Sequence, residues 1–207
     1  MQYLVRSYTT MASNTTVAWY NKKENVEEYE KMCEGYDGGF LITALKKHLP
    51  EGSTLLELGM GLGKDLDLLK ATYKVTGSDV SKEFMNRYKA KNPQADLIGV
   101  DAVLLDTPRA FDCIYSNKVL HHLSRSDLQI SVENQKKRLS KSGVLFHTVW
   151  AVVDGKREES MHGMLFTYNT VDEIKALYEK VGLKVLESVV YNEMSDNDSF
   201  YIIAKKL

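Results

Sequence analysis

The chain has 207 residues, of which 43% are hydrophobic and 27% are charged, values ordinary for a soluble globular protein. A chain of this length suffices for one domain and buries about 70% of the surface that it exposes when unfolded. Its 27 basic and 28 acidic residues give a net charge of -1, so there is no electrostatic case for a nucleic-acid-binding or membrane-surface protein.

The cysteine pattern indicates a reducing compartment, and the hydropathy of the sequence gives no sign of a membrane-spanning segment. The two cysteines, Cys33 and Cys113, lie far apart and form neither a zinc motif nor a disulfide framework. No apolar run approaches the roughly 18 residues of a membrane span, and the N-terminus carries no export signal. We therefore expect a cytoplasmic protein that does not enter a membrane.

The first 50 residues contain no strand pattern. Residues 1–16 are polar and without periodicity, which predicts a flexible N-terminal arm. Residues 17–35 place apolar side chains at helical spacing, and residues 40–49 predict a second helix that Pro50 ends. We expect residues 17–50 to form a helical lid at the start of a single domain over residues 17–207.

From Thr54 the sequence alternates between short apolar runs and amphipathic segments. This alternation with short loops predicts a parallel sheet with helices on both faces. The expected strands are residues 54–58, 73–78, 96–100, 111–116 and 143–149, and the expected helices are residues 64–71, 82–91 and 127–141.

The C-terminal part breaks this alternation. After an expected helix over residues 170–181, two strands, 183–191 and 200–204, follow one another without a helix between them. Two such strands pair as an antiparallel hairpin. The cofactor-binding half would then be residues 53–149, and residues 150–207 would carry an acceptor-side loop, a helix and this hairpin.

One glycine-rich stretch lies where a nucleotide-like ligand binds such a sheet. Gly59, Gly61 and Gly63 separate the first strand from the helix that begins at Lys64, and Glu57 stands just before them. Glycines let a ligand approach the backbone, and the helix N-terminus offers free N–H groups. A dinucleotide fingerprint needs Gly-x-Gly-x-x-Gly, whereas the spacing here is Gly-x-Gly-x-Gly. An acid at position 57 suits an ammonium group better than a pyrophosphate.

At this point the chain resembles the class I S-adenosylmethionine-dependent methyltransferases, especially the small-molecule type. The resemblance spans residues 17–207 and implies a three-layer Rossmann-like α/β sandwich, with a seven-stranded, mostly parallel sheet that ends in an antiparallel hairpin. It rests on Glu57-x-Gly59-x-Gly61-x-Gly63, Gly77-Ser78-Asp79, Asp101-Ala102, the strand from Phe111 to Asn117, Leu120-His121-His122-Leu123 and the terminal hairpin.

The resemblance implies roles for the acids of this site. Glu57 would face the ammonium group of the cofactor, or be a strand-end carboxylate satisfied by backbone N–H groups. Asp79 would accept the ribose hydroxyls, a role compatible with capping the next helix. Asp101 would accept the adenine amino group, with a plain helix cap as the alternative.

The remaining cofactor contacts implied by the resemblance come from the backbone and from apolar side chains. The backbone would approach the methionine portion and the ribose at the three glycines. The other contacts would come from Val80, Ala102, Ser116 and Asn117.

Methyl transfer from a sulfonium is an in-line displacement, in which the enzyme mainly supplies alignment and excludes water. A general base helps only where the acceptor must lose a proton. His121 and His122 are the candidates, and at most one is expected to face the substrate. Packing of this pair is the competing interpretation. No third ligand stands at metal-binding spacing, so no metal is expected.

Aromatic residues gather where a lid would close over a sulfonium, and rings there offer cation–π attraction. We favour Tyr20 and Tyr36 beside the cofactor, and Trp150 and Tyr168 on the substrate side. In the segment 152–164, basic side chains could meet an acidic substrate, but a solvated loop is the preferred interpretation. His147 alternates with apolar residues and is expected in the core.

The sequence thus predicts methyl transfer from S-adenosylmethionine to a small molecule, with no nucleic-acid partner. A silent cofactor-binding regulator or a protein methyltransferase is the alternative, and a nicotinamide-dependent oxidoreductase is a remote one. The acceptor and the oligomeric state stay open.

Overall fold

A seven-stranded sheet forms the centre of the molecule in the computed structural model, which describes residues 11–207. The strand order is β3-β2-β1-β4-β5-β9-β8. Strands β3, β2, β1, β4 and β5 are parallel, whereas β9 runs antiparallel to both β5 and β8. The strands are β1 (Thr54–Leu58), β2 (Lys74–Ser78), β3 (Leu97–Ile98), β4 (Phe111–Asn117), β5 (Leu139–Trp150), β8 (Leu183–Tyr191) and β9 (Ser199–Lys206). The predicted fold class is confirmed.

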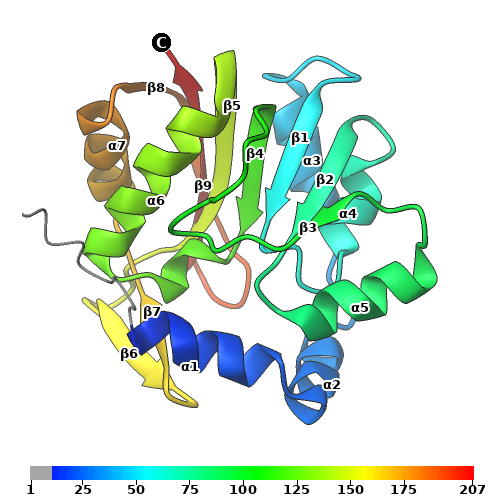
Figure 1. The fold of residues 1–207 in the computed structure, drawn as a ribbon. Coiled ribbons are helices and arrows are strands. Elements are labelled where there is room, and N and C mark those ends of the chain that lie inside the picture. Colours follow the sequence, from blue (N-terminus) through cyan, green and yellow to red (C-terminus); the bar gives the residue numbers. More distant parts are fainter. Residues whose placement is uncertain (1–10) are drawn as a thin grey trace, which may run out of the picture.

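Helices cover both faces of the sheet (Figure 1). Helix α3 (Gly39–Lys46) and α4 (Lys64–Leu69) pack on one face, through Leu41, Leu45 and Leu69. The opposite face is covered by α6 (Arg125–Arg138) and α7 (Val171–Lys180). Helix α5 (Lys82–Lys91) lies beside α4, where Tyr88 joins Leu66 and Met60 in a smaller apolar cluster.

The chain order reverses between β1 and β4, so a crevice forms at the carboxyl ends of these strands, the usual ligand position in an open α/β sheet. Several short elements lie across this edge, at the bottom of Figure 1. They are α1 (Met11–Tyr20), α2 (Lys23–Met32), the 3-10 turn η1 (Leu120–His122), β6 (Glu158–Met161) and β7 (Met164–Thr167).

One N-terminal prediction is wrong, and the flexible arm expected over residues 1–16 stays a prediction. Residues 1–10 lie outside the described residues, and α1, which begins at Met11, contacts β7 and η1. The single helix expected over residues 17–35 is two helices, α1 and α2, separated at Asn21 and Lys22. The Asn21 side chain there accepts a hydrogen bond from the Lys82 N–H and so fixes the break against α5.

The solvated loop expected within residues 152–164 is also wrong in part, because β6 begins at Glu158 and pairs with β7 in an antiparallel hairpin. The third strand is shorter than predicted, only Leu97–Ile98. The fifth is longer: it begins at Leu139, directly after α6, because Leu139 pairs with Phe111 across a register shift.

His147 is a satisfied core histidine, as predicted. It is fully buried on β5, between the Tyr178 hydroxyl at Nδ1 and Gln135 Oε1, 2.8 Å from Nε2. Because Oε1 can only accept, Nε2 carries the proton and Nδ1 accepts from Tyr178. Burial lowers the pKa of His147 to about 3, so the folded protein keeps this ring neutral.

We predict that stability falls between pH 6.5 and pH 5 in part through His147. A histidine in the unfolded chain has a pKa of about 6.5. Below that pH, His147 binds a proton in the unfolded chain but stays neutral in the folded one, which favours unfolding. The loss is about 1.4 kcal/mol per pH unit, or roughly 2 kcal/mol at pH 5. Denaturant melts of His147→Gln should start from lower stability at pH 7 and lose less than the wild type on acidification. His162→Gln, at an exposed position, is the control; an unchanged pH slope in His147→Gln would contradict this account.

Candidate functional site

The glycine turn after β1 has a left-handed backbone at all three glycines, with φ of 75° at Gly59, 49° at Gly61 and 78° at Gly63. A Cβ at Gly59 would lie 2.4 Å from the Val119 side chain, and one at Gly63 would lie 2.3 Å from the Tyr88 ring. At Gly61 the nearest atom would be a Tyr29 ring carbon at 3.9 Å. Packing therefore requires the outer two glycines, whereas the middle one leaves room beside the backbone.

We predict that Gly63→Ala destabilises the fold by at least about 2 kcal/mol, because backbone strain and a clash with Tyr88 add together. Gly52→Ala is the matched control: its φ of 78° gives the same strain, but nothing lies within 4 Å of its Cβ, so a loss of about 1 kcal/mol is expected. Chemical denaturation of both variants measures the difference. Equal losses would exclude the clash.

Asp79 joins the glycine turn to the end of β2. Its Oδ2 accepts from the Gly61 N–H at 2.9 Å, and its Oδ1 accepts from the Ser81 N–H at 2.8 Å. Ser81 caps α5 by accepting from the Phe84 N–H. Burial raises the pKa of Asp79, against the lowering effect of these backbone hydrogen bonds. The half-buried Val80 lies between Asp79 and Ser81 in the chain.

Tyr20 lies beside this turn, where the sequence places it. Its carbonyl accepts a hydrogen bond from the Ser81 hydroxyl at 2.6 Å. Its ring lies 5.5 Å from the rings of both Tyr29 and Phe84. Burial, followed by the charge of Asp79, raises the pKa of the Tyr20 hydroxyl. A cleft of about 510 Å³ opens next to this cluster, between α2, α4 and α5, with Leu62 and Phe84 in its lining.

Glu57 ends β1 beneath the glycine turn. Its side chain is 3% exposed, and its buried Oε2 has no hydrogen-bond partner within residues 11–207. Burial, followed by the charges of Asp65 and Asp79, raises the pKa of Glu57 well above the usual range. The expected alternative, a carboxylate satisfied by backbone N–H groups, does not hold for Oε2.

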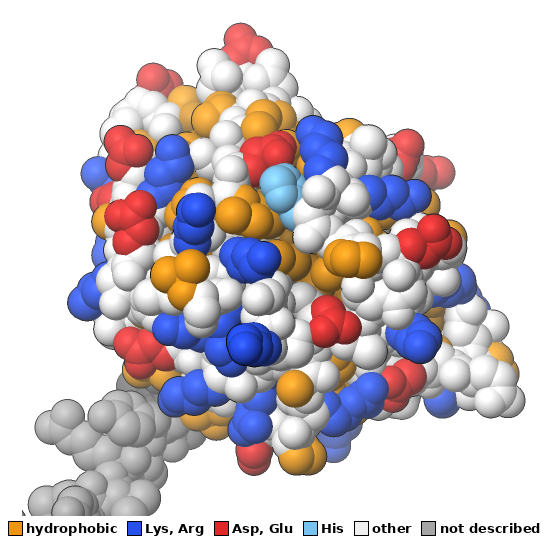
Figure 2. All heavy atoms as spheres, turned by 90° about the horizontal axis from the view of Figure 1, so that it is seen from above, with side chains coloured by type: hydrophobic (Ala, Val, Ile, Leu, Met, Phe, Trp, Pro, Cys, Tyr) orange, Lys and Arg blue, Asp and Glu red, His pale blue; other side chains and the backbone are white. Residues whose placement is uncertain are grey.

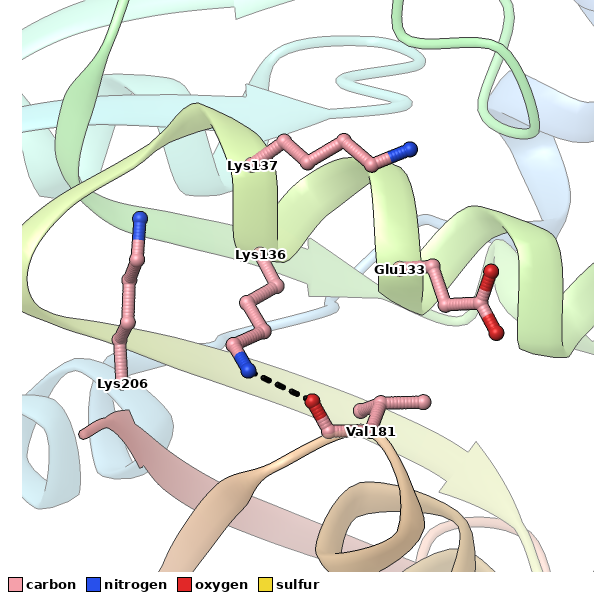
Figure 3. Close-up of a pocket in the computed structure, with 5 residues that line it drawn as sticks. All are labelled: Glu133, Lys136, Lys137, Val181 and Lys206. Carbon is pink, nitrogen blue, oxygen red and sulfur yellow. Dashed lines mark hydrogen bonds between the residues drawn. The ribbon is translucent and has the colours of Figure 1, made fainter.

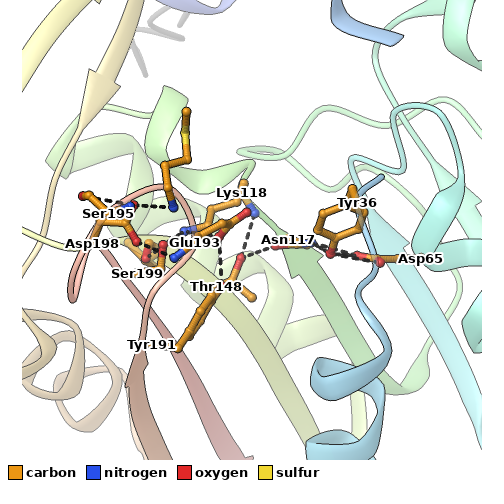
Figure 4. Close-up of polar contacts among 12 residues, drawn as sticks. Tyr36, Asp65, Asn117, Lys118, Thr148, Tyr191, Glu193, Ser195, Asp198 and Ser199 are labelled. Atoms are coloured by element: carbon orange, nitrogen blue, oxygen red, sulfur yellow. Dashed lines mark hydrogen bonds and ion pairs between the residues drawn. The ribbon is translucent and has the colours of Figure 1, made fainter. Parts of the chain in front are cut away.

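A second buried carboxylate, Asp65, lies in the first turn of α4 and was not predicted. Asp65 Oδ2 accepts from the Tyr115 hydroxyl and from Asn117 Nδ2, both at 2.8 Å, and Oδ1 accepts from the Tyr36 hydroxyl at 3.1 Å (Figure 4). Asn117 also donates to the Tyr36 hydroxyl at 2.5 Å. Asp65 thus holds Tyr36 and Asn117 together, and their contacts with a cofactor stay a prediction.

The same chain of contacts continues to the acceptor side through Asn117, whose Oδ1 accepts from the Thr148 hydroxyl. Lys118 follows with a φ of 51°, and its N–H donates to Thr148 Oγ1. Its Nζ donates to Ser199 Oγ at 2.6 Å and pairs with Glu193 at 3.1 Å (Figure 4). The same Nζ lies 3.6 Å from the centre of the Trp150 ring. Burial lowers the pKa of Lys118 to about 8, opposed by Glu193.

The two histidines lie under the lid. The His121 ring stacks on Phe166 at 5.0 Å, and its buried Nδ1 has no partner among the described residues. His122 Nδ1 donates to the Leu165 carbonyl at 3.0 Å, and its ring lies 5.9 Å from that of Tyr20. Burial lowers the pKa of His122 to about 4 and that of His121 well below its usual range. Both rings are neutral at pH 7.

The substrate-side aromatics separate into two groups. Trp150 lies 6.4 Å from the His121 ring, next to the histidines. Tyr168 instead donates to Glu159 on β6 and lies under Lys156, toward the exposed side of the hairpin. Phe166 contacts both histidine rings. The alternation of side chains along β7 distinguishes Phe166 from its neighbours, but sequence gives no sign of which face meets the histidines.

Three further predicted residues follow β3 and β4. Asp101 Oδ1 accepts from the N–H groups of Val103 and Leu104 at 2.8 and 3.0 Å and so caps a turn. No helix begins there, so the helix-cap alternative is wrong, and the adenine contact stays a prediction. The Ala102 carbonyl accepts from the Ser131 hydroxyl. Ser116 is fully buried, and its Oγ has no partner among residues 11–207.

The described residues contain no group of three or more His, Cys, Asp or Glu side chains arranged to hold a metal ion. Within the same part of the chain, every helix is too short or too polar to cross a bilayer. The two basic side chains considered for an acidic substrate both form ion pairs within the protein: Lys156 pairs with Glu159, and Arg157 pairs with Glu173.

The model of the methyltransferase domain family matches residues 30–188, a range that contains the glycine turn, all three buried carboxylates and both histidines. The chain belongs to this family. It is therefore a methyltransferase, and its architecture is that of the class I S-adenosylmethionine-dependent enzymes.

Solved structures share the whole architecture at low identity. The 1,6-didemethyltoxoflavin-N1-methyltransferase of Burkholderia thailandensis, solved with 1,6-didemethyltoxoflavin and S-adenosylhomocysteine, superposes with a TM-score of 0.78 at 16% identity, covering 94% of this chain and 89% of that one. The magnesium protoporphyrin IX methyltransferase of Synechocystis, solved with S-adenosylhomocysteine, gives 0.74 at 12% identity, covering 94% and 100%.

A curated relative points to a different acceptor. The tRNA (carboxymethyluridine(34)-5-O)-methyltransferase of Arabidopsis thaliana is 32% identical over 112 residues. The match covers 53% of this chain and only 27% of the relative, so the chain spans about a quarter of that protein's length.

Proposed function

We propose that this methyltransferase transfers the methyl group of S-adenosylmethionine to a small molecule. The observation that supports S-adenosylmethionine as the cofactor is Glu57 Oε2. This oxygen is buried beneath a glycine turn that is open at Gly61, and it has no hydrogen-bond partner in the described part of the chain. A carboxylate there fits a ligand that brings an ammonium group. A nicotinamide dinucleotide would instead bring a pyrophosphate to the same turn and meet like charge.

The residues present fit the parts of S-adenosylmethionine. In this proposal Glu57 faces the ammonium group, Asp79 accepts the ribose hydroxyls, and Asp101 with the Ala102 N–H receives the adenine. Tyr36 and Asn117, held by Asp65, border the methionine portion. When bound, the cofactor supplies an electrophilic methyl group on a sulfonium. The chain's own contribution is to align that group with the acceptor and to exclude water, worth on the order of 7–11 kcal/mol.

The acceptor side is aromatic and uncharged at the histidines, which favours a small, partly apolar acceptor. Phe166, Trp150 and the neutral rings of His121 and His122 form this wall. Neutral histidines can accept a proton but do not donate one. The structural neighbours named for 1,6-didemethyltoxoflavin and magnesium protoporphyrin IX have acceptors of this kind.

A nucleic-acid acceptor, as in the Arabidopsis relative, is favoured less. A groove of about 430 Å³ lined by Lys136, Lys137, Lys206, Glu133 and Val181 offers basic groups (Figure 3). It lies where β5 begins and β9 ends, at the edge of the sheet opposite the glycine turn. The face seen in Figure 2, at that edge, mixes blue and red side chains rather than forming one basic surface.

Calorimetry tests the cofactor assignment first. We expect S-adenosylmethionine to bind with a dissociation constant between about 1 μM and 1 mM, and NAD not to bind. Asp79→Asn should weaken binding of S-adenosylmethionine by about 10- to 100-fold, since it removes a charged acceptor of two hydrogen bonds. Asp172→Asn, an exposed carboxylate on α7, is the control. Absence of binding by the wild type at millimolar concentration would refute the cofactor assignment.

A panel of small molecules and tRNA, with release of S-adenosylhomocysteine as the readout, tests the acceptor. Where the acceptor must lose a proton, we expect His121→Gln to lower kcat by about 10² to 10⁴ and to alter the pH–rate profile, because Nδ1 is free to accept. His122→Gln should retain more activity, because its Nδ1 already donates to Leu165. Equal effects of the two substitutions would contradict this choice, and turnover of tRNA alone would replace the small-molecule acceptor.

A further inference from the structure

The carboxylates at the glycine turn lack cationic partners. Glu57, Asp65 and Asp79 are each no more than 9% exposed. Among the described residues, no Lys, Arg or His forms an ion pair with any of the three. The nearest basic residue in sequence, Lys64, donates to the Cys33 carbonyl at the end of α2.

The three acids differ in how well an ionised form would be solvated. Asp79 accepts two backbone N–H groups, and Asp65 accepts two tyrosine hydroxyls and an amide. Among the described residues, no group donates to Glu57 Oε2. A buried anionic oxygen without a donor is unfavourable, so among the three Glu57 is the group that a proton stabilises most.

We propose that Glu57 carries a proton in the cofactor-free enzyme and loses it when the ammonium group of the methionine portion binds. The O–H bond of the Glu57 carboxyl breaks, the proton passes to the buffer, and the resulting carboxylate pairs with the ligand's ammonium. This inference rests on the proposed function, because it takes the ligand to be S-adenosylmethionine or its product.

The groups around Glu57 support the direction of this exchange. Every charged group that raises the pKa of Glu57 is another carboxylate: Asp65 and Asp67 from α4, and Asp79 from the end of β2. Its other titratable neighbours are tyrosines, Tyr115 on β4 and Tyr88 on α5, each with a pKa raised above its ordinary value and therefore neutral at pH 6–8. In this proposal, the ammonium group of the bound ligand supplies the positive charge for this group of carboxylates.

Calorimetry in several buffers measures the proton directly. At a fixed pH near 6.5, the binding enthalpy of S-adenosylhomocysteine is plotted against the ionisation enthalpy of MES, PIPES and imidazole buffers, and the slope gives the protons exchanged. We expect release approaching one proton per molecule bound. Affinity should fall as pH decreases, by at most about tenfold per pH unit, because protons compete with the ammonium.

Two comparisons assign the proton. 5′-Methylthioadenosine keeps the adenosine part but lacks the amino-acid part, so its binding should release none. Glu57→Gln should bind S-adenosylhomocysteine without proton release and with a flatter pH dependence, while still binding 5′-methylthioadenosine, which verifies its fold. Glu51→Gln, an exposed carboxylate before the other end of β1, should behave as the wild type.

The outcomes separate this proposal from the one on which it rests. Binding of S-adenosylhomocysteine without proton release overturns the proton on Glu57 and leaves the cofactor assignment intact. Equal release with 5′-methylthioadenosine, or unchanged release in Glu57→Gln, assigns the proton to another group such as Asp79 and also overturns it. No binding of S-adenosylhomocysteine at all would refute both proposals.

Discussion

The structure depends on three carboxylates buried around one glycine turn without a protein cation beside them in the described part of the chain. Burial of like charges raises the pKa of each, and hydrogen bonds alone offset that cost at Asp65 and Asp79. Such a site is unfavourable for anions and favourable for a ligand that brings positive charge. This constraint distinguishes it from the phosphate-binding turns that share its backbone.

The hydrogen bonds that solvate these acids also organise the rest of the crevice. Asp79 holds Gly61 to the end of β2, and Asp65 holds Tyr36 of the N-terminal segment to Asn117 of β4. From Asn117 the contacts continue through Thr148 to Lys118 and Trp150. These contacts form one connected network from Asp65 to Trp150, so a change at one end is expected to affect the other.

The sequence predicted the parts of this site that local pattern encodes. Glu57 is the penultimate residue of β1, the glycines follow that strand, and Asp79 follows β2. Asp65 was missed because an acid in the first turn of a helix is common for reasons of the helix dipole alone. Its three donors come from Tyr36, Tyr115 and Asn117, which are distant in the chain. Phe166 belongs to the aromatic cluster that the sequence places after the fifth strand but was not singled out, and Lys118 was missed for the same reason.

The sequence by itself determined the alternation of strands and helices, the glycine turn and the acids at strand ends, because periodicity and spacing are properties of neighbouring residues. Only the tertiary structure decided which side chains share a buried volume. The order β2-β1-β4 brings three strand ends to one crevice, and α1, β6 and β7 lie across it (Figure 1). The state of Glu57 follows from that enclosure, since a carboxylate's pKa is set by what surrounds it and not by its place in the chain.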